Sequence, residues 1–177
     1  MLSTIVLCED SPSGRAGADI AVMLARTLAS LVPAKIDGVL YDVKIAGPAK
    51  AGLGFLANHA GCALIEAHSE EERLKRALKE ARGPNVFLLR CGQAPEPGFA
   101  EEVHDFLAQN SAACLRPAQL RAAPESILER LFPSLAPVAG IIALRESLLS
   151  APCGGFRKLT GSIGPAIILR TRARFVG

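Results

Sequence analysis

One stretch of the chain decides how the rest is interpreted: Gly83-Pro84-Asn85-Val86-Phe87-Leu88-Leu89-Arg90-Cys91-Gly92-Gln93-Ala94-Pro95-Glu96-Pro97-Gly98-Phe99. Its apolar first half is typical of a buried strand, a polar turn follows, and the spacing then predicts a helix over residues 98–109. In open α/β sheets ligands bind at the carboxyl ends of such strands. Arg90, Cys91 and Gly92 stand at that end, so they determine which chemistry is available there.

The segments on either side alternate between predicted strands and helices. Before residue 83 we expect a strand at 4–8, a helix at 16–31 ended by Pro33, a strand at 36–43, a short helix ending near His59, a strand at 63–66 and a helix from Ser69 to Gly83. After residue 109 we expect a strand at 113–115, a short helix at 125–131, an apolar run at 140–144, a helical turn at 146–149, a turn at 153–156 and a last apolar run at 166–169.

This order is that of βαβ units. It predicts an α/β fold, a three-layer αβα sandwich around a mostly parallel sheet. No linker composition separates a second unit, so we expect residues 1–177 to form a single domain.

Composition excludes several classes of protein. Half of the 177 residues are hydrophobic, the net charge is only +3, and the basic residues are spread along the chain, which is no footprint for nucleic acid. Arg170, Arg172 and Arg174 alternate near the end, a spacing typical of one face of a strand or of a solvated terminus. No apolar run approaches the roughly 18 residues that a membrane span needs.

Cysteine usage favours a reducing compartment. The five cysteines show no CxxC pair and no zinc spacing, and the first residues are too short and uncharged for a signal peptide, so we expect a cytoplasmic protein. Cys8 and Cys91 both close predicted strands and are candidates to lie together, as a redox or metal pair or as small buried side chains.

Several blocks of the sequence resemble family 2 glycosyltransferases. They are residues 24–31, a strand ending in Asp42, residues 56–65, and residues 85–89 followed by Glu96-Pro97-Gly98-Phe99. Farther along, residues 140–149 and Gly154-Gly155-Phe156-Arg157 resemble the acceptor-side segment of that family. The resemblance implies the GT-A fold of nucleotide-diphospho-sugar transferases, with a nucleotide or nucleotide-sugar as partner.

The acids that this family uses have no match here. Such enzymes usually hold a divalent cation with a DxD-like acidic pair at the fourth strand's end, and the cation offsets charge on the leaving diphosphate. Arg90-Cys91-Gly92 stands there instead, and hard cations prefer oxygen ligands. The later catalytic acid is also missing, because no Asp or Glu follows Glu146. We therefore expect no catalytic residue of the family's kind, no divalent metal and no other cofactor.

Five residues remain as candidates for binding a nucleotide. Glu9 and Asp10 follow the first strand, where the resemblance places an acid near the nucleobase. Asp42 matches the first acid of a paired-Asp motif near the ribose, although its partner position is Val43. Arg15 and Arg90 carry guanidinium forks that suit phosphate oxygens. For Arg90 the alternative is a structural ion pair with Glu9 or Asp10.

Two functions stay open at this point. The first is a transferase that uses an activated sugar or nucleotide without a bound metal, with Arg15 and Arg90 holding phosphate. The second is a non-catalytic nucleotide-binding or protein-interaction module on the same fold. The sequence is compatible with a homo-oligomer or a protein partner, and it identifies neither.

Overall fold

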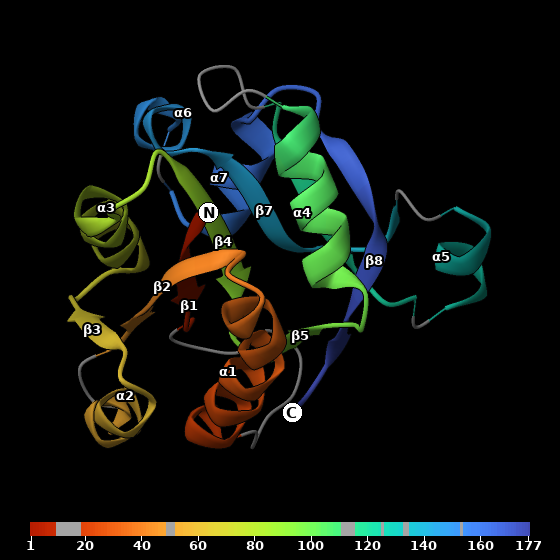
Figure 1. The fold of residues 1–177 in the computed structure, drawn as a ribbon. Helices are drawn as coiled ribbons and strands as arrows, with labels where there is room; N and C mark the ends of the chain where they lie inside the picture. Colours follow the sequence, from red (N-terminus) through yellow and green to blue (C-terminus); the bar gives the residue numbers. More distant parts are fainter. Residues whose placement is uncertain (10–18, 49–51, 111–115, 125, 133–134, 153) are drawn as a thin grey trace.

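The computed structural model describes residues 1–9, 19–48, 52–110, 116–124, 126–132, 135–152 and 154–177. Eight strands form one twisted sheet in the order β3-β2-β1-β4-β7-β6-β8-β5 (Figure 1). The strands are β1 (Leu2–Leu7), β2 (Leu40–Gly47), β3 (Ala63–Glu66), β4 (Asn85–Arg90), β5 (Gln93–Pro95), β6 (Ala118–Ala122), β7 (Val138–Leu144) and β8 (Ile167–Phe175).

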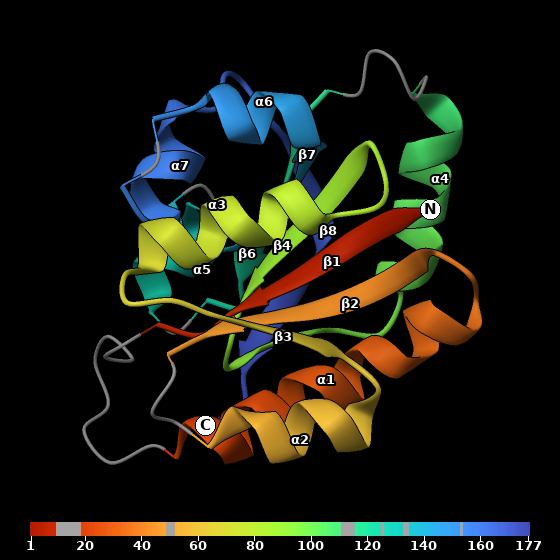
Figure 2. The same ribbon diagram turned by 90° about the vertical axis from the view of Figure 1, so that its left-hand side faces the viewer.

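Helices cover both faces of this sheet (Figure 2). They are α1 (Ile20–Ile36), α2 (Leu53–Ala60), α3 (Glu70–Glu80), α4 (Phe99–Gln109), α5 (Ile127–Leu131), α6 (Arg145–Ser150) and α7 (Phe156–Ser162). One core cluster joins α1, α2 and α4 to the sheet, and a second joins α3, α6 and α7 to the opposite face. Alternate residues of one strand enter opposite clusters, as Phe87 and Leu88 of β4 do. The three-layer α/β architecture predicted from the sequence is confirmed.

The sheet is mixed in direction. Among the described strands, β3, β2, β1 and β4 are parallel to one another, whereas β7 runs antiparallel to both β4 and β6. Strand β8 is parallel to β6 and antiparallel to β5. Parallel pairing therefore dominates the amino-terminal half, where βαβ crossovers occur, and antiparallel pairing the other half.

Most of the predicted elements in the first half of the chain are present, with one shift that matters for the site. Pro33 does not end the first helix, because α1 continues to Ile36 and the Asp37 N–H donates to the Pro33 carbonyl at 2.9 Å. Buried Ala34 holds this last turn against the core. The next strand consequently begins at Leu40 and runs to Gly47, so Asp42 lies near its start and not at its end.

The second half departs further from the prediction. Strands β5 and β6 and helix α7 were not expected, and β8 is much longer than the apolar run at 166–169. The Arg170, Arg172 and Arg174 alternation does lie on a strand. The strand predicted at 113–115 lies outside the described residues. No helix in the described part of the chain is long and apolar enough to cross a membrane.

Candidate functional site

The site lies where the strand order reverses. The chain adds β2 and β3 on one side of β1 and then β4 on the other, so the carboxyl ends of β1 and β4 form a switch point. Ligands bind at such points in open α/β sheets because the crossing helices diverge there. The parallel register places Leu7 opposite Arg90. Glu9 leaves β1 at this edge of the sheet, beside the end of β4.

A bidentate ion pair between Arg90 and Glu9 occupies this edge of the sheet. Arg90 donates from Nε to Glu9 Oε1 at 2.7 Å and from Nη2 to Glu9 Oε2 at 3.0 Å. The two side chains are only 16% and 18% exposed. The Arg90 Cζ atom also lies 5.7 Å from the centre of the Phe156 ring, within the range of a cation–π contact. The ion pair with Glu9 that the sequence offered for Arg90 is therefore present.

The surroundings hold this pair in place. Phe156 is buried at the start of α7, and its N–H donates to Glu70 Oε1 on α3 at 2.7 Å. In the turn that follows β4, Gly92 has a φ of +84°, a conformation that favours glycine. The Gly92 N–H donates to the Thr27 hydroxyl at 2.9 Å, which ties the turn to α1. Arg90 thus ends β4 between a turn tied to α1 and the Phe156 ring of α7.

The guanidinium of Arg90 occupies the carboxylate of Glu9 at this position. Both Glu9 oxygens accept from the Arg90 guanidinium, so a metal ion would have to displace a bound cation to reach them. Within the described residues no three His, Cys, Asp or Glu side chains converge on one point. Hard cations need several oxygen ligands.

Of the remaining predicted site residues, Asp42 lies away from this edge. Asp10 and Arg15 lie outside the described residues. Asp42 faces Ser3 on β1, and at about 3.3 Å per residue it is some 16 Å along β2 from the strand's end at Gly47. Its carboxylate lies 3.1 Å from Lys44 Nζ. Both residues line a separate cavity of about 690 Å³ between α1, α2 and β2.

The thiols of Cys8 and Cys91 lie together behind the ion pair. The Cys91 N–H extends the β1–β4 ladder by donating to the Leu7 carbonyl at 2.9 Å. The pKa of the Cys8 thiol is raised far above its ordinary value, first by its hydrogen bond with Cys91 and then by complete burial. The protonated, buried thiol of Cys8 matches the prediction of a small buried side chain, whereas Cys91 is only partly buried.

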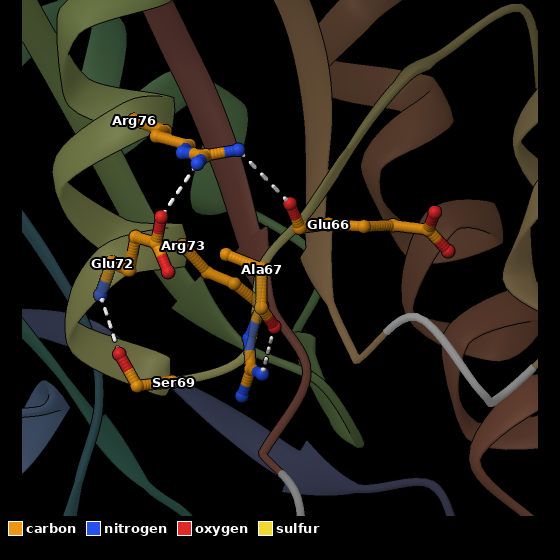
Figure 3. A network of polar contacts seen from close by, with 6 residues as sticks. All are labelled: Glu66, Ala67, Ser69, Glu72, Arg73 and Arg76. Carbon is orange, nitrogen blue, oxygen red and sulfur yellow. Dashed lines mark hydrogen bonds and ion pairs between the residues drawn. The ribbon is translucent and has the colours of Figure 1, made fainter.

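A second arginine, Arg73, was missed by the sequence analysis. It projects from the first turn of α3 and is fully buried, with Nη1 donating to the Ala67 carbonyl at 3.1 Å (Figure 3). Its charge lowers the pKa of Cys8, against the larger opposing effects, which places the guanidinium close to the end of β1. The helical spacing of Arg73 with Ala77 would have revealed its buried position.

The carboxyl edge continues past Arg90 into a cavity of about 340 Å³. Its walls come from β4, β6, β7 and α7, and they include Arg121 and Arg157. Neither was predicted as a site residue, although Arg157 belongs to the block that resembles the family's acceptor-side segment. Strand β6 carries only a weak strand signal, and α7 follows glycines that favour a turn.

Comparison with known proteins gives a clear result for structure only. No protein-family model matches the chain, and no curated protein matches it. Glucosyl-3-phosphoglycerate synthase from Mycobacterium tuberculosis, in complex with Mn²⁺, UDP-glucose and phosphoglyceric acid, is similar with a TM-score of 0.67 at 16% identity, over 99% of this chain and 72% of that one.

Two further solved structures show the same likeness. TarS from S. aureus (residues 1–349) has a TM-score of 0.64 at 11% identity, over 99% of this chain and 60% of that one. HddC from Yersinia pseudotuberculosis has a TM-score of 0.61 at 9% identity, over 98% of this chain and 92% of that one. At these identities the likeness shows the fold, and the fold is the GT-A type that the sequence blocks predicted.

Proposed function

We propose that this chain is a glycosyltransferase-like protein that binds a nucleotide-diphospho-sugar, or its nucleotide, at the switch point between β1 and β4 without a divalent cation. The observation that carries the proposal is the Arg90–Glu9 pair. It lies on a GT-A fold, at the strand end to which the sequence resemblance assigns the family's metal-binding motif. The synthase from M. tuberculosis binds UDP-glucose together with Mn²⁺, which supports a nucleotide-sugar as the partner.

In this proposal the protein's own cation takes part of the metal's role. The guanidinium of Arg90 supplies positive charge and planar donors suited to phosphate oxygens. Glu9 and the Phe156 ring keep it oriented, so little reorganisation accompanies binding. Its single charge is partly neutralised by Glu9. The stabilisation of a leaving diphosphate is therefore weaker than a divalent ion would provide, and we expect no metal-dependent transfer.

A non-catalytic binding module is the second candidate function. It is favoured by the absence of any Asp or Glu after Glu146, where the resembling family has its catalytic acid. Without a carboxylate there, no general base of that kind is available to an acceptor hydroxyl. Such a module would bind the nucleotide or a protein partner and release no product.

Calorimetric titration of UDP, GDP and UDP-glucose tests the proposal, once with EDTA and once with MnCl₂. We expect binding in EDTA that Mn²⁺ does not strengthen. Arg90→Gln should weaken it at least tenfold, which is about 1.4 kcal/mol. Arg130→Gln, which removes an exposed charge on α5, is the matched control and should change nothing.

Two results would contradict the proposal. Binding that depends on Mn²⁺ would refute the metal-free site, and the absence of binding by all three nucleotides would refute the nucleotide function. Release of UDP from bound UDP-glucose identifies the transferase. Tight binding without release identifies the module.

A further inference from the structure

The cavity next to the Arg90–Glu9 pair is strongly cationic. The register of the sheet places Leu89 of β4 and Leu120 of β6 on either side of Gly140 of β7. Arg90 and Arg121 each follow by one residue. A register shift after Leu120 places Arg121 opposite Val138, and both arginines line the same cavity at this edge of the sheet. Two strand spacings separate them, or about 10 Å. Helix α7 closes the space between them with Thr160 and Arg157.

A fourth arginine lies beside Arg121 on the neighbouring strand. The parallel pairing of β6 with β8 makes Arg172 the register partner of Arg121, and both side chains are partly buried. Burial lowers the pKa of Arg121, and the neighbouring charge of Arg172 lowers it further. Two cations held side by side and partly shielded from water are costly unless an anion compensates them.

The described residues do not supply that anion. The walls of the cavity hold three arginines and no Asp or Glu among the residues that the structure places there, and Glu9 is engaged by Arg90. Arg121 donates from Nη1 to the Ala136 carbonyl at 2.7 Å, while its Nε is buried without a hydrogen-bond partner. The Nη1 atom of Arg172 is also buried without a hydrogen-bond partner.

The size of the cavity restricts the ligand. A volume of about 340 Å³ lies at the lower end of the range for ligand pockets, which suits a small molecule of a few heavy atoms around one anionic group. The amide of Gln119 adds a neutral polar group to the wall. The cavity shares Arg90 and Phe156 with the switch point.

We infer that this cavity binds the phosphate or carboxylate group of a small acceptor molecule, held by Arg121 and Arg157 beside the nucleotide. The term acceptor rests on the proposed function, whereas the anion site rests on the arginine geometry. Arg121 would give oriented donors and Arg157, at the exposed rim, would attract the anion.

Three small ligands show whether the cavity recognises a phosphate, a carboxylate or only hydroxyl groups: glycerol 3-phosphate, glycerate and uncharged glycerol. Each is titrated by calorimetry into the full chain saturated with UDP, at ionic strength held constant with KCl because salt screens exposed charges. We expect millimolar binding of one or both anions and none of glycerol. Arg157→Gln and Arg121→Gln should each weaken anion binding at least fivefold, and Arg121→Lys should restore part of it.

The matched control is Arg170→Gln, which removes an exposed charge from the neighbouring strand β8 and should leave anion binding unchanged. Equal binding of glycerol, an effect of Arg170→Gln as large as that of Arg157→Gln, or no effect of either cavity variant would overturn the inference. If Arg121→Gln fails to fold, the effect of Arg157→Gln on anion binding tests the inference, because Arg157 is exposed. If UDP itself does not bind, the titrations run without it still test the cavity while the proposed function fails separately.

Discussion

The Arg90–Glu9 pair should contribute measurably to stability, and its coupling energy can be worked from its geometry. Exposed ion pairs contribute about 0–1 kcal/mol, whereas breaking a fully buried pair costs about 3–5 kcal/mol. With both side chains more than four-fifths buried and two hydrogen bonds between them, we expect an intermediate coupling of about 2 kcal/mol. In a chain of this length that corresponds to roughly 4–8 °C in Tm.

A double-mutant cycle isolates this energy. Glu9→Gln, Arg90→Gln and the double variant are unfolded in urea and followed by circular dichroism, since the chain contains no tryptophan. The same cycle on Glu71 and Lys75, an i,i+4 pair on α3 that is about half exposed, serves as control and should give less than about 0.5 kcal/mol. Coupling at Arg90 no larger than in this control would refute the view that the pair is a structural element of the site.

Three further outcomes follow from the same structure. Glu102→Gln should lower the free energy of unfolding by about 1.5 kcal/mol at pH 7, because the carboxylate accepts hydrogen bonds from Thr171 that outweigh burial and hold its pKa below the ordinary 4.5. This loss should shrink as the pH falls below 4.5 and the wild-type carboxyl becomes protonated. Urea titrations of both proteins at pH 7 and pH 3 would show the difference. Gly140→Ala should lower stability by about 1–3 kcal/mol in thermal melts, because the new methyl group would lie 2.9 Å from the Phe87 ring and 3.0 Å from a backbone oxygen; an unchanged Tm would contradict the packing. Cys8 should react with iodoacetamide only after unfolding, as measured by peptide mass spectrometry, and rapid labelling of the native protein would disprove its burial.

The elements that could be predicted are those with strong local signals. The strand and helix of residues 83–109, the strand at 63–66 and the helix that starts after Ser69 all appear within one or two residues of expectation. Each has either a continuous apolar run or a capped helical repeat, which are properties of neighbouring residues. The same signals sufficed for the α/β class.

The elements that could not be predicted depend on distant partners. Strand β5 has only three residues and exists because it pairs with the end of β8. Strand β6 contains two polar residues and lies between β7 and β8. Asp42 was assigned to a strand end because Pro33 was expected to end the preceding helix, whereas burial of Ala34 carries that helix one turn further.

The candidate site divides in the same way. The amino-acid sequence alone determined the βαβ order, the lack of acids at Arg90-Cys91-Gly92 and the lack of any carboxylate after Glu146, since these are properties of order and composition. Only the tertiary structure decided that Glu9 binds Arg90, that Asp42 lies away from both, and that Arg121 and Arg90 line the same cavity on either side of β7. Glu9 and Arg90 are 81 residues apart. Contacts over such separations are set by strand register and packing between layers, which no local pattern encodes.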